Sequence, residues 1–167
     1  SVSNPDQLHL NGNTVQQLAD DRGCEGVEAA LQLLRDNQGD VTIISFNQSE
    51  ENLRKVLSHP LTSIITDGLM TAGKPHPRTF GTYPTFLGEY TRDKGWMSLE
   101  AAIHKATGQP AERFHLDRQG LLRSDYIASI VVFSAAEIGT KSNYIDPAHP
   151  PEGIEHVIVN GVWAVRG

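Results

Sequence analysis

The stretch that begins at Asp67 gathers the residue types of an acid–base and anion-binding site. Asp67 follows a β-branched run, and Lys74, His76 and Arg78 stand on alternate residues with a proline between each pair. Proline restricts its own backbone and that of the residue before it, so we expect the basic stretch to be rigid. A carboxylate beside rigidly held basic side chains is typical of a pocket for an anionic substrate.

Each of these features also has a plainer interpretation. An aspartate before a glycine is ordinary turn chemistry, and a basic loop with prolines is also found as a solvated surface turn. The remaining histidines show no spacing typical of metal ligands. Cys24 is the only cysteine, which excludes an internal disulfide and a zinc site made of thiolates. The residue types alone leave both a catalytic site and a surface turn open.

The elements before Asp67 follow a helix–strand–helix–strand order. Two β-branched runs, 41–46 (VTIISF) and 62–66 (TSIIT), are predicted to be buried parallel strands, and the second ends at Asp67. Helices are predicted over 14–22 and 25–37, and from a cap at Ser49 to Pro60. In the second of these helices, Val27, Ala30, Leu31 and Leu34 follow the 3, 4, 7 spacing of a helix. Enzymes with such β/α units place catalytic groups at the carboxyl ends of their strands.

The second half changes from helices to short strands. Residues 69–83 are predicted to be a long loop, and residues 134–153 an irregular connection. The predicted helices are Pro84 to about Arg92 and Leu99 to Thr107, the latter capped by Ser98. The predicted strands are 126–133, 154–159 and 162–165, with Asn160 and Gly161 as the hairpin turn between the last two.

Composition and charge limit the classes of partner. The 167 residues include 15 Gly, 9 Pro and 38% hydrophobic residues, which is typical of a globular chain. The net charge of −6 argues against nucleic acid or an anionic membrane as the main partner. Because the sequence shows neither an apolar run of about 20 residues nor a signal-peptide pattern, we expect a soluble, cytoplasmic chain. A complete (β/α)8 barrel of about 250 residues does not fit this length.

Five motifs, in order, resemble the C-terminal part of the D-aminoacylases, the N-acyl-D-amino-acid deacylases of the metal-dependent amidohydrolase superfamily. They are HPLTSIITDG, GKPHPRTFGTYPTFLGEY, MSLEAAIHKATGQPAERF, GLLRSDYIASIVVF and HPPEGIEHVIVNGVWAVRG. The resemblance implies an α/β fold in which residues 1–118 hold the last two β/α units and closing helices of a TIM-type barrel. Residues 119–167 would then supply strands of a small β-domain, and the barrel within this chain would be incomplete. Asp125 stands where the family has glycine.

The resemblance also implies roles for the residues considered first. Asp67 would be the general base that takes a proton from a zinc-bound water and passes it to the leaving amine. It would be at most a weak or shared zinc ligand. Lys74, His76 and Arg78 would lie over the mouth of the site and bind the carboxylate of an N-acyl-D-amino acid. The family's other zinc ligands, including a His-x-His motif, have no counterpart here, so we expect the isolated chain neither to hold zinc nor to be active.

Two functional hypotheses follow from the resemblance. In the first, the chain supplies Asp67 and the basic loop to an enzyme completed by an N-terminal part of the barrel or through self-association. In the second, it is a stand-alone, non-catalytic binding or assembly protein derived from the same fold. An in-phase upstream reading frame with His-x-His would favour the first hypothesis, and a start codon at Ser1 the second.

Overall fold

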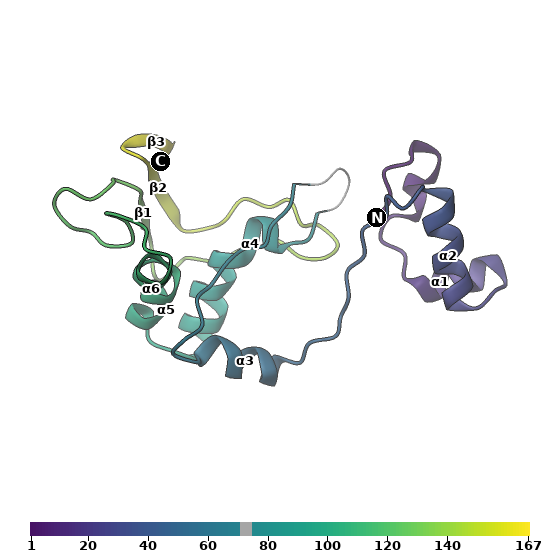
Figure 1. Cartoon of the computed structure of the whole chain (residues 1–167), viewed down its shortest axis with the longest axis horizontal. Coiled ribbons are helices and arrows are strands. Elements are labelled where there is room, and N and C mark those ends of the chain that lie inside the picture. Colours follow the sequence, from purple (N-terminus) through teal and green to yellow (C-terminus); the bar gives the residue numbers. More distant parts are fainter. Residues whose placement is uncertain (71–74) are drawn as a thin grey trace.

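The computed structural model describes residues 1–70 and 75–167 as helices joined by long connections, with one small sheet near the C-terminus (Figure 1). Its elements are η1 (Pro5–Leu10), α1 (Val15–Arg22), α2 (Gly26–Asp36), α3 (Glu50–Ser58), α4 (Arg78–Thr85), η2 (Phe86–Asp93), α5 (Leu99–Ala106), α6 (Gly108–Arg113), β1 (Ile130–Phe133), β2 (Ile154–Val159) and β3 (Val162–Arg166). Among the described helices, none is both long and apolar enough to cross a membrane.

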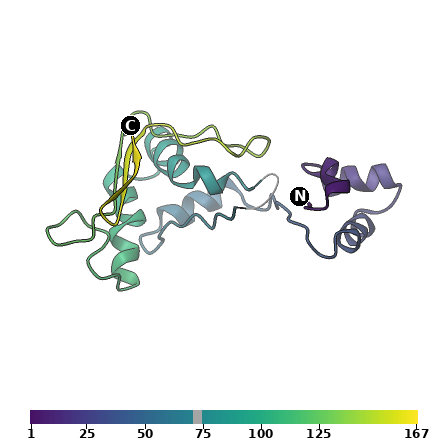
Figure 2. The same cartoon turned by 90° about the horizontal axis from the view of Figure 1, so that it is seen from above.

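The first three helices form a small unit of their own. Thr14 and Gln17 make a reciprocal capping box at the start of α1, and Gly23 ends this helix in the left-handed conformation with φ 63°. A small hydrophobic cluster joins α1, α2 and the first residues of the chain; its buried members are Val2, Leu18, Ala19, Ala29 and Leu33. Figures 1 and 2 show this unit at one end of the molecule.

The helix predicted over 25–37 is formed as α2, but its buried residues are not those of the 3, 4, 7 spacing. Ala29 and Leu33 are the buried residues, whereas Val27 and Leu31 are 75% and 62% exposed. The reason is that α1 packs against the stripe carrying Ala29 and Leu33, and no other element among the described residues covers the opposite side. Val27 and Leu31, two members of the spacing pattern, therefore face solvent.

The two predicted parallel strands are also not formed. Of residues 41–46 only Val41 pairs, in a single antiparallel bridge with Val2, and residues 62–66 carry no strand. A β-branched run becomes a strand only when a neighbouring strand supplies a ladder of hydrogen-bond partners, and among the described residues no strand lies alongside either run. Residues 42–48 instead run as an extended connection to α3, with Ile43 and Phe46 exposed.

A second hydrophobic cluster lies between α4, η2, α5 and the connection after β1. Its buried members are Ile64, Phe86, Leu87, Ala102 and Ile138. The helix predicted from Pro84 begins earlier, at Arg78, so residues 78–83 are helical and Pro84 lies inside α4. The early start has a local cause, because the N–H groups of Thr79 and Phe80 donate to the carbonyls of His76 and Pro77 at 3.0 and 3.1 Å.

The π-helix η2 continues directly from α4 and lies against the connection after β1. Gly88 makes this approach possible, since a Cβ atom at this position would lie 2.3 Å from the carbonyl oxygen of Ile138. Arg92 extends the contact by donating through Nη1 to the carbonyls of Ala136 and Ile138, at 3.0 and 2.8 Å. The contact fixes η2 to the loop between β1 and β2.

The C-terminal strands form an antiparallel sheet in the order β1-β2-β3. Both turn residues between β2 and β3 have positive φ, 50° for Asn160 and 82° for Gly161, as a two-residue hairpin turn requires. The predicted hairpin is therefore confirmed, although β1 begins at Ile130, four residues later than predicted. Asp125 takes the left-handed conformation with φ 68°, which aspartate tolerates better than most residues. Ser98 caps α5 as predicted.

Candidate functional site

Asp67 and Arg78 form an ion pair in the structure. Arg78 Nη2 lies 2.9 Å from Asp67 Oδ2, and both side chains reach solvent, with 41% and 68% of their surfaces exposed. Asp67 has a φ of 46°, an uncommon conformation for a residue other than glycine that aspartate tolerates better than most. The left-handed turn thus ends the extended run 62–66 with the carboxylate beside the first residue of α4.

The start of α4 holds Arg78 in place. Its backbone N–H donates to His76 Nδ1 at 3.1 Å, and the first turn of the helix carries its side chain toward Asp67. The Nε atom of Arg78 is buried and has no hydrogen-bond partner among the described residues. A guanidinium presents its donors in a planar fork that suits a carboxylate. Arg78 therefore has one donor engaged by Asp67 and another without an acceptor.

His76 lies between these two charged groups. Burial lowers the pKa of the imidazole, the nearby Arg78 guanidinium lowers it further, and the Asp67 carboxylate acts in the opposite direction. The acceptor role of Nδ1 places the proton of the neutral ring on Nε2. The structure therefore favours a neutral imidazole that orients the loop rather than a third cation in the site.

Tyr144 contacts His76, and Phe46 contacts Tyr144 in turn; the sequence singled out neither of these aromatic residues for the site. The ring of Tyr144 meets the imidazole edge-on at 5.2 Å between centroids, and Phe46 meets Tyr144 at 4.8 Å. They come from the extended connection 42–48 and from the irregular connection 134–153, so no local pattern marks them. Only the ring contacts in the three-dimensional structure identify them as neighbours of the site.

Lys74, the remaining predicted member of the basic loop, lies outside the described residues. Within residues 1–70 and 75–167, no three histidine, cysteine or acidic side chains come together as a metal-binding group. Zinc sites use three or four such ligands, so Asp67 and its described neighbours do not by themselves fit a zinc ion. The ion pair with Arg78 instead occupies one oxygen of this carboxylate.

A hollow of about 540 Å³ lies elsewhere, against α5 and α6. His104, Glu112 and His115 line it, together with residues of the loop that follows α6. The hollow is open to solvent, and its acidic and histidine side chains do not gather as metal ligands. The chemistry of the ion pair, rather than the size of a hollow, therefore marks Asp67 and Arg78 as the candidate site.

Residues 8–165 match the Amidohydrolase family, and the chain belongs to this family. It is 35% identical over 156 residues to the D-aminoacylase of Alcaligenes xylosoxydans xylosoxydans, an alignment that covers 92% of this chain and 31% of that protein. The resemblance to N-acyl-D-amino-acid deacylases is thereby confirmed. The chain spans about one third of the length of the relatives it matches.

Solved structures of this group share the fold. One is the N-acyl-D-glutamate deacylase of Bordetella bronchiseptica, complexed with zinc and a phosphonate that mimics the tetrahedral intermediate; its TM-score is 0.89 at 29% identity over 97% of this chain and 33% of that one. Another is a D-aminoacylase with a binuclear metal centre, with a TM-score of 0.87 at 32% identity over 95% of this chain and 32% of that one. The family and these structures imply a TIM-type barrel domain, and metal dependence is a property of these relatives.

Proposed function

We propose that this chain forms the C-terminal part of a zinc-dependent amidohydrolase that cleaves the amide bond of N-acyl-D-amino acids. The single observation that carries the proposal is the ion pair between Asp67 and Arg78, because it brings a proton-transferring carboxylate to a carboxylate-binding guanidinium. The family match over residues 8–165 and the deacylase relatives support the same reaction class.

Each member of the pair has one role in this proposal. Asp67 accepts a proton from the attacking water and returns it to the nitrogen of the leaving amine as the amide bond breaks. Arg78 binds the carboxylate of the substrate through the solvent-exposed part of its guanidinium, beside the donor that pairs with Asp67. His76 holds the loop, and we assign Lys74 to the same loop as a further cation from the sequence alone.

The division of the chain follows from the same proposal. Residues 1–118 would be the last β/α units and closing helices of an incomplete barrel, and residues 119–167 part of a small β-domain. Zinc, which the glutamate-specific relative holds, would be bound mainly by residues outside the described set, since these do not fit the ion. We propose a cytoplasmic setting and, for the isolated chain, no hydrolytic activity.

The Asp67→Asn variant tests the proposal. In the enzyme completed by its N-terminal part, we expect kcat for N-acetyl-D-amino acids to fall by about 10²- to 10⁴-fold, since asparagine cannot move the proton. The isolated chain, assayed in parallel with Zn²⁺, should be inactive. Wild-type activity of Asp67→Asn in the completed enzyme would refute the role of the carboxylate.

The role of Arg78 is tested by removing the charge of the substrate and, in a variant, the charge of Arg78 as well. The wild-type enzyme should prefer N-acetyl-D-methionine over its uncharged carboxamide, and Arg78→Met should lose most of this preference through a higher KM for the acid. Binding by a charge-assisted pair predicts a loss of about tenfold or more. If the ratio of kcat/KM for the acid to kcat/KM for the carboxamide were the same in Arg78→Met as in the wild type, the substrate carboxylate would have to bind elsewhere.

A further inference from the structure

The extended run that ends at Asp67 is held by two helices. Its central residue, Ile64, is buried, and both of its backbone polar groups are paired. The N–H of Ile64 donates to the carbonyl of Lys105 at 3.3 Å, and the hydroxyl of Tyr83 donates to the carbonyl of Ile64 at 3.2 Å. These contacts take the place of the strand partners that the run lacks within the described residues.

The ammonium of Lys105 supplies a second pair of contacts to the same run. Nζ donates to the carbonyl of Thr62 at 3.1 Å and also to that of His59. The residue is only 5% exposed, and its ammonium has no carboxylate within ion-pair distance among the described residues. Burial of a charged group costs free energy that an apolar side chain of similar length would avoid. The carbonyls that it holds are therefore the reason for a lysine at this position.

Helix α4 holds the run at two points. Arg78, its first residue, pairs with Asp67, and Tyr83 binds Ile64 five residues later. Five helical residues span about 7.5 Å, and the three-residue step from Ile64 to Asp67 spans about 10 Å when extended. Because these lengths are similar, the run can lie along the helix, and the two contacts fix both its position and its direction.

We propose that Lys105 and Tyr83 are positioning residues that hold the carbonyls of residues 59–64 so that Asp67 meets Arg78. The catalytic consequence rests on the function proposed above, but the positioning itself does not. Lys105 fixes the beginning of the run and Tyr83 its centre, and Asp67 is the first residue beyond the part they hold.

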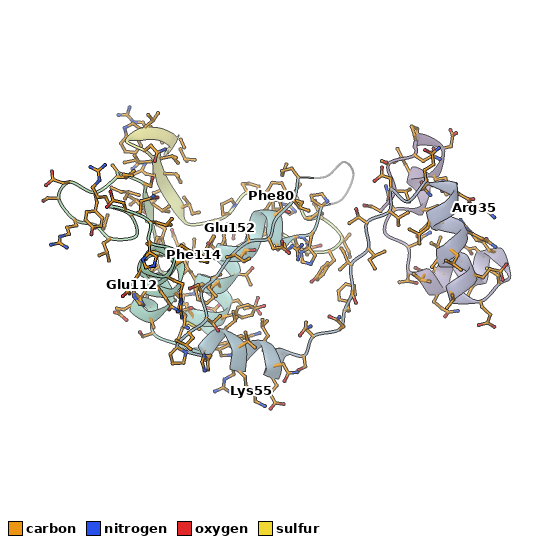
Figure 3. The ribbon with its side chains drawn as sticks, in the orientation of Figure 1. Arg35, Lys55, Phe80, Glu112, Phe114 and Glu152 are labelled. Atoms are coloured by element: carbon orange, nitrogen blue, oxygen red, sulfur yellow. The ribbon has the colours of Figure 1, made fainter. Side chains whose placement is uncertain are left out.

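The test compares matched variants of the full 167-residue chain. Tyr83→Phe removes only the hydroxyl, Lys105→Met removes the ammonium, and Lys105→Arg keeps a cation that can donate to carbonyls. The controls are Tyr90→Phe, whose ring stacks on Trp96 at 4.5 Å, and Lys55→Met, whose side chain points outward from α3 (Figure 3). Amide hydrogen exchange is followed by NMR, together with the guanidinium protons of Arg78.

We expect Tyr83→Phe to speed exchange at residues 64–68 by about five- to tenfold, the effect of losing one net hydrogen bond, and Lys105→Met, which loses two, to speed it at least as much. The guanidinium signals of Arg78 should broaden in the same variants, while α1 and α2 keep wild-type protection. Lys105→Arg should restore the protection that Lys105→Met loses. Should Lys105→Met fail to fold, Tyr83→Phe decides the question.

Unchanged exchange at residues 64–68 in folded Tyr83→Phe overturns the proposal, as does an equal increase in both target and control variants. In the completed enzyme, a positioning role lowers kcat with little change in KM. Loss of activity in Asp67→Asn without any exchange effect of Tyr83→Phe would leave the proposed function intact and refute the positioning. The converse result would support the positioning and refute the catalytic role of Asp67.

Discussion

His76 reports on both charged partners of the candidate site. Its ring nitrogen Nδ1 accepts a hydrogen bond from the backbone N–H of Arg78. The charge of Arg78 lowers the pKa of the imidazole, and the charge of Asp67 raises it. Burial and the guanidinium together outweigh the carboxylate, so the pKa of His76 lies below 6.5. A neutral imidazole keeps the hydrogen bond that helps to start α4, whereas a protonated ring would lose this acceptor.

We expect an NMR titration of the His76 ring to give a midpoint below 6.5, and Arg78→Met to move it upward because a neighbouring cation is removed. The unfolded chain takes up this proton at higher pH than the folded chain, so the free energy of unfolding should fall as the pH drops through 6.5 toward the folded pKa. A titration midpoint above 6.5 in the wild type would contradict the structure.

At the scale of single residues, the sequence predicts what lies close along the chain. Asp67 and Arg78 were identified from residue type, from the proline spacing and from a β-branched run, and the structure brings them together. Tyr144 and Phe46 could not be predicted in this way, because they lie in connections far from the site in the sequence and belong to no motif. The roles assigned to the predicted residues remain predictions.

Among the secondary-structure elements, the π-helix η2 depends on the close approach of its Gly88 to the backbone carbonyl of Ile138. Gly88 lies so close to the carbonyl of Ile138 that any Cβ would overlap it. Thr91 is buried beside it, and its side-chain hydroxyl donates to the carbonyl of Phe86 at 2.8 Å, five residues back. This side-chain bond gives the Phe86 carbonyl a partner inside η2.

Gly88→Ala should therefore lower the free energy of unfolding by about 2–3 kcal/mol, since backbone rather than a flexible side chain must move. Gly26→Ala is the matched control, because its Cβ would meet only Val15 Cγ1 at an ordinary 3.7 Å, and it should be neutral or slightly stabilising. Urea unfolding followed by circular dichroism measures both. Equal stabilities of the two variants would show that η2 does not need this approach.

The helix caps and the hairpin were predictable because their causes are local. Ser49 and Ser98 each accept a backbone N–H three residues ahead, and the Asn160–Gly161 turn follows from positive φ at both positions. The runs 41–46 and 62–66 were predicted as strands and are not, because strand formation requires a partner that a local pattern does not supply. The position of Pro84 predicts a helix start there, although the turn at His76 and Pro77 already begins α4.

At the scale of the whole molecule, the chain exposes more surface than its size requires. Its accessible area is 11,359 Å², whereas a compact monomer of 18.3 kDa exposes about 8,100 Å². Much of the excess is apolar, including Val27 and Leu31 on α2 and Ile43 and Phe46 in the extended connection. The difference of about 3,000 Å² is comparable to the area that obligate protein interfaces bury.

We therefore expect the isolated chain to self-associate. Light scattering coupled to size-exclusion chromatography should give a mass above 18.3 kDa at micromolar concentration. Leu31→Glu should shift the distribution toward the monomer, because a charge on the exposed stripe opposes its burial. The control is Lys55→Glu on the charged outer side of α3, which should leave the mass unchanged. A monodisperse monomer of the wild type would contradict this expectation.

The two hydrophobic clusters have a thermodynamic consequence. One joins the first residues to α1 and α2, the other joins α4, η2 and α5, and the extended connection between them contributes no buried apolar residue to either. All-or-none unfolding requires that the loss of one contact weakens the rest, and these two sets share no buried member. We therefore expect each cluster to have its own melting equilibrium, so that the heat absorbed on unfolding, measured by calorimetry, divides into two transitions unless a binding partner joins the clusters.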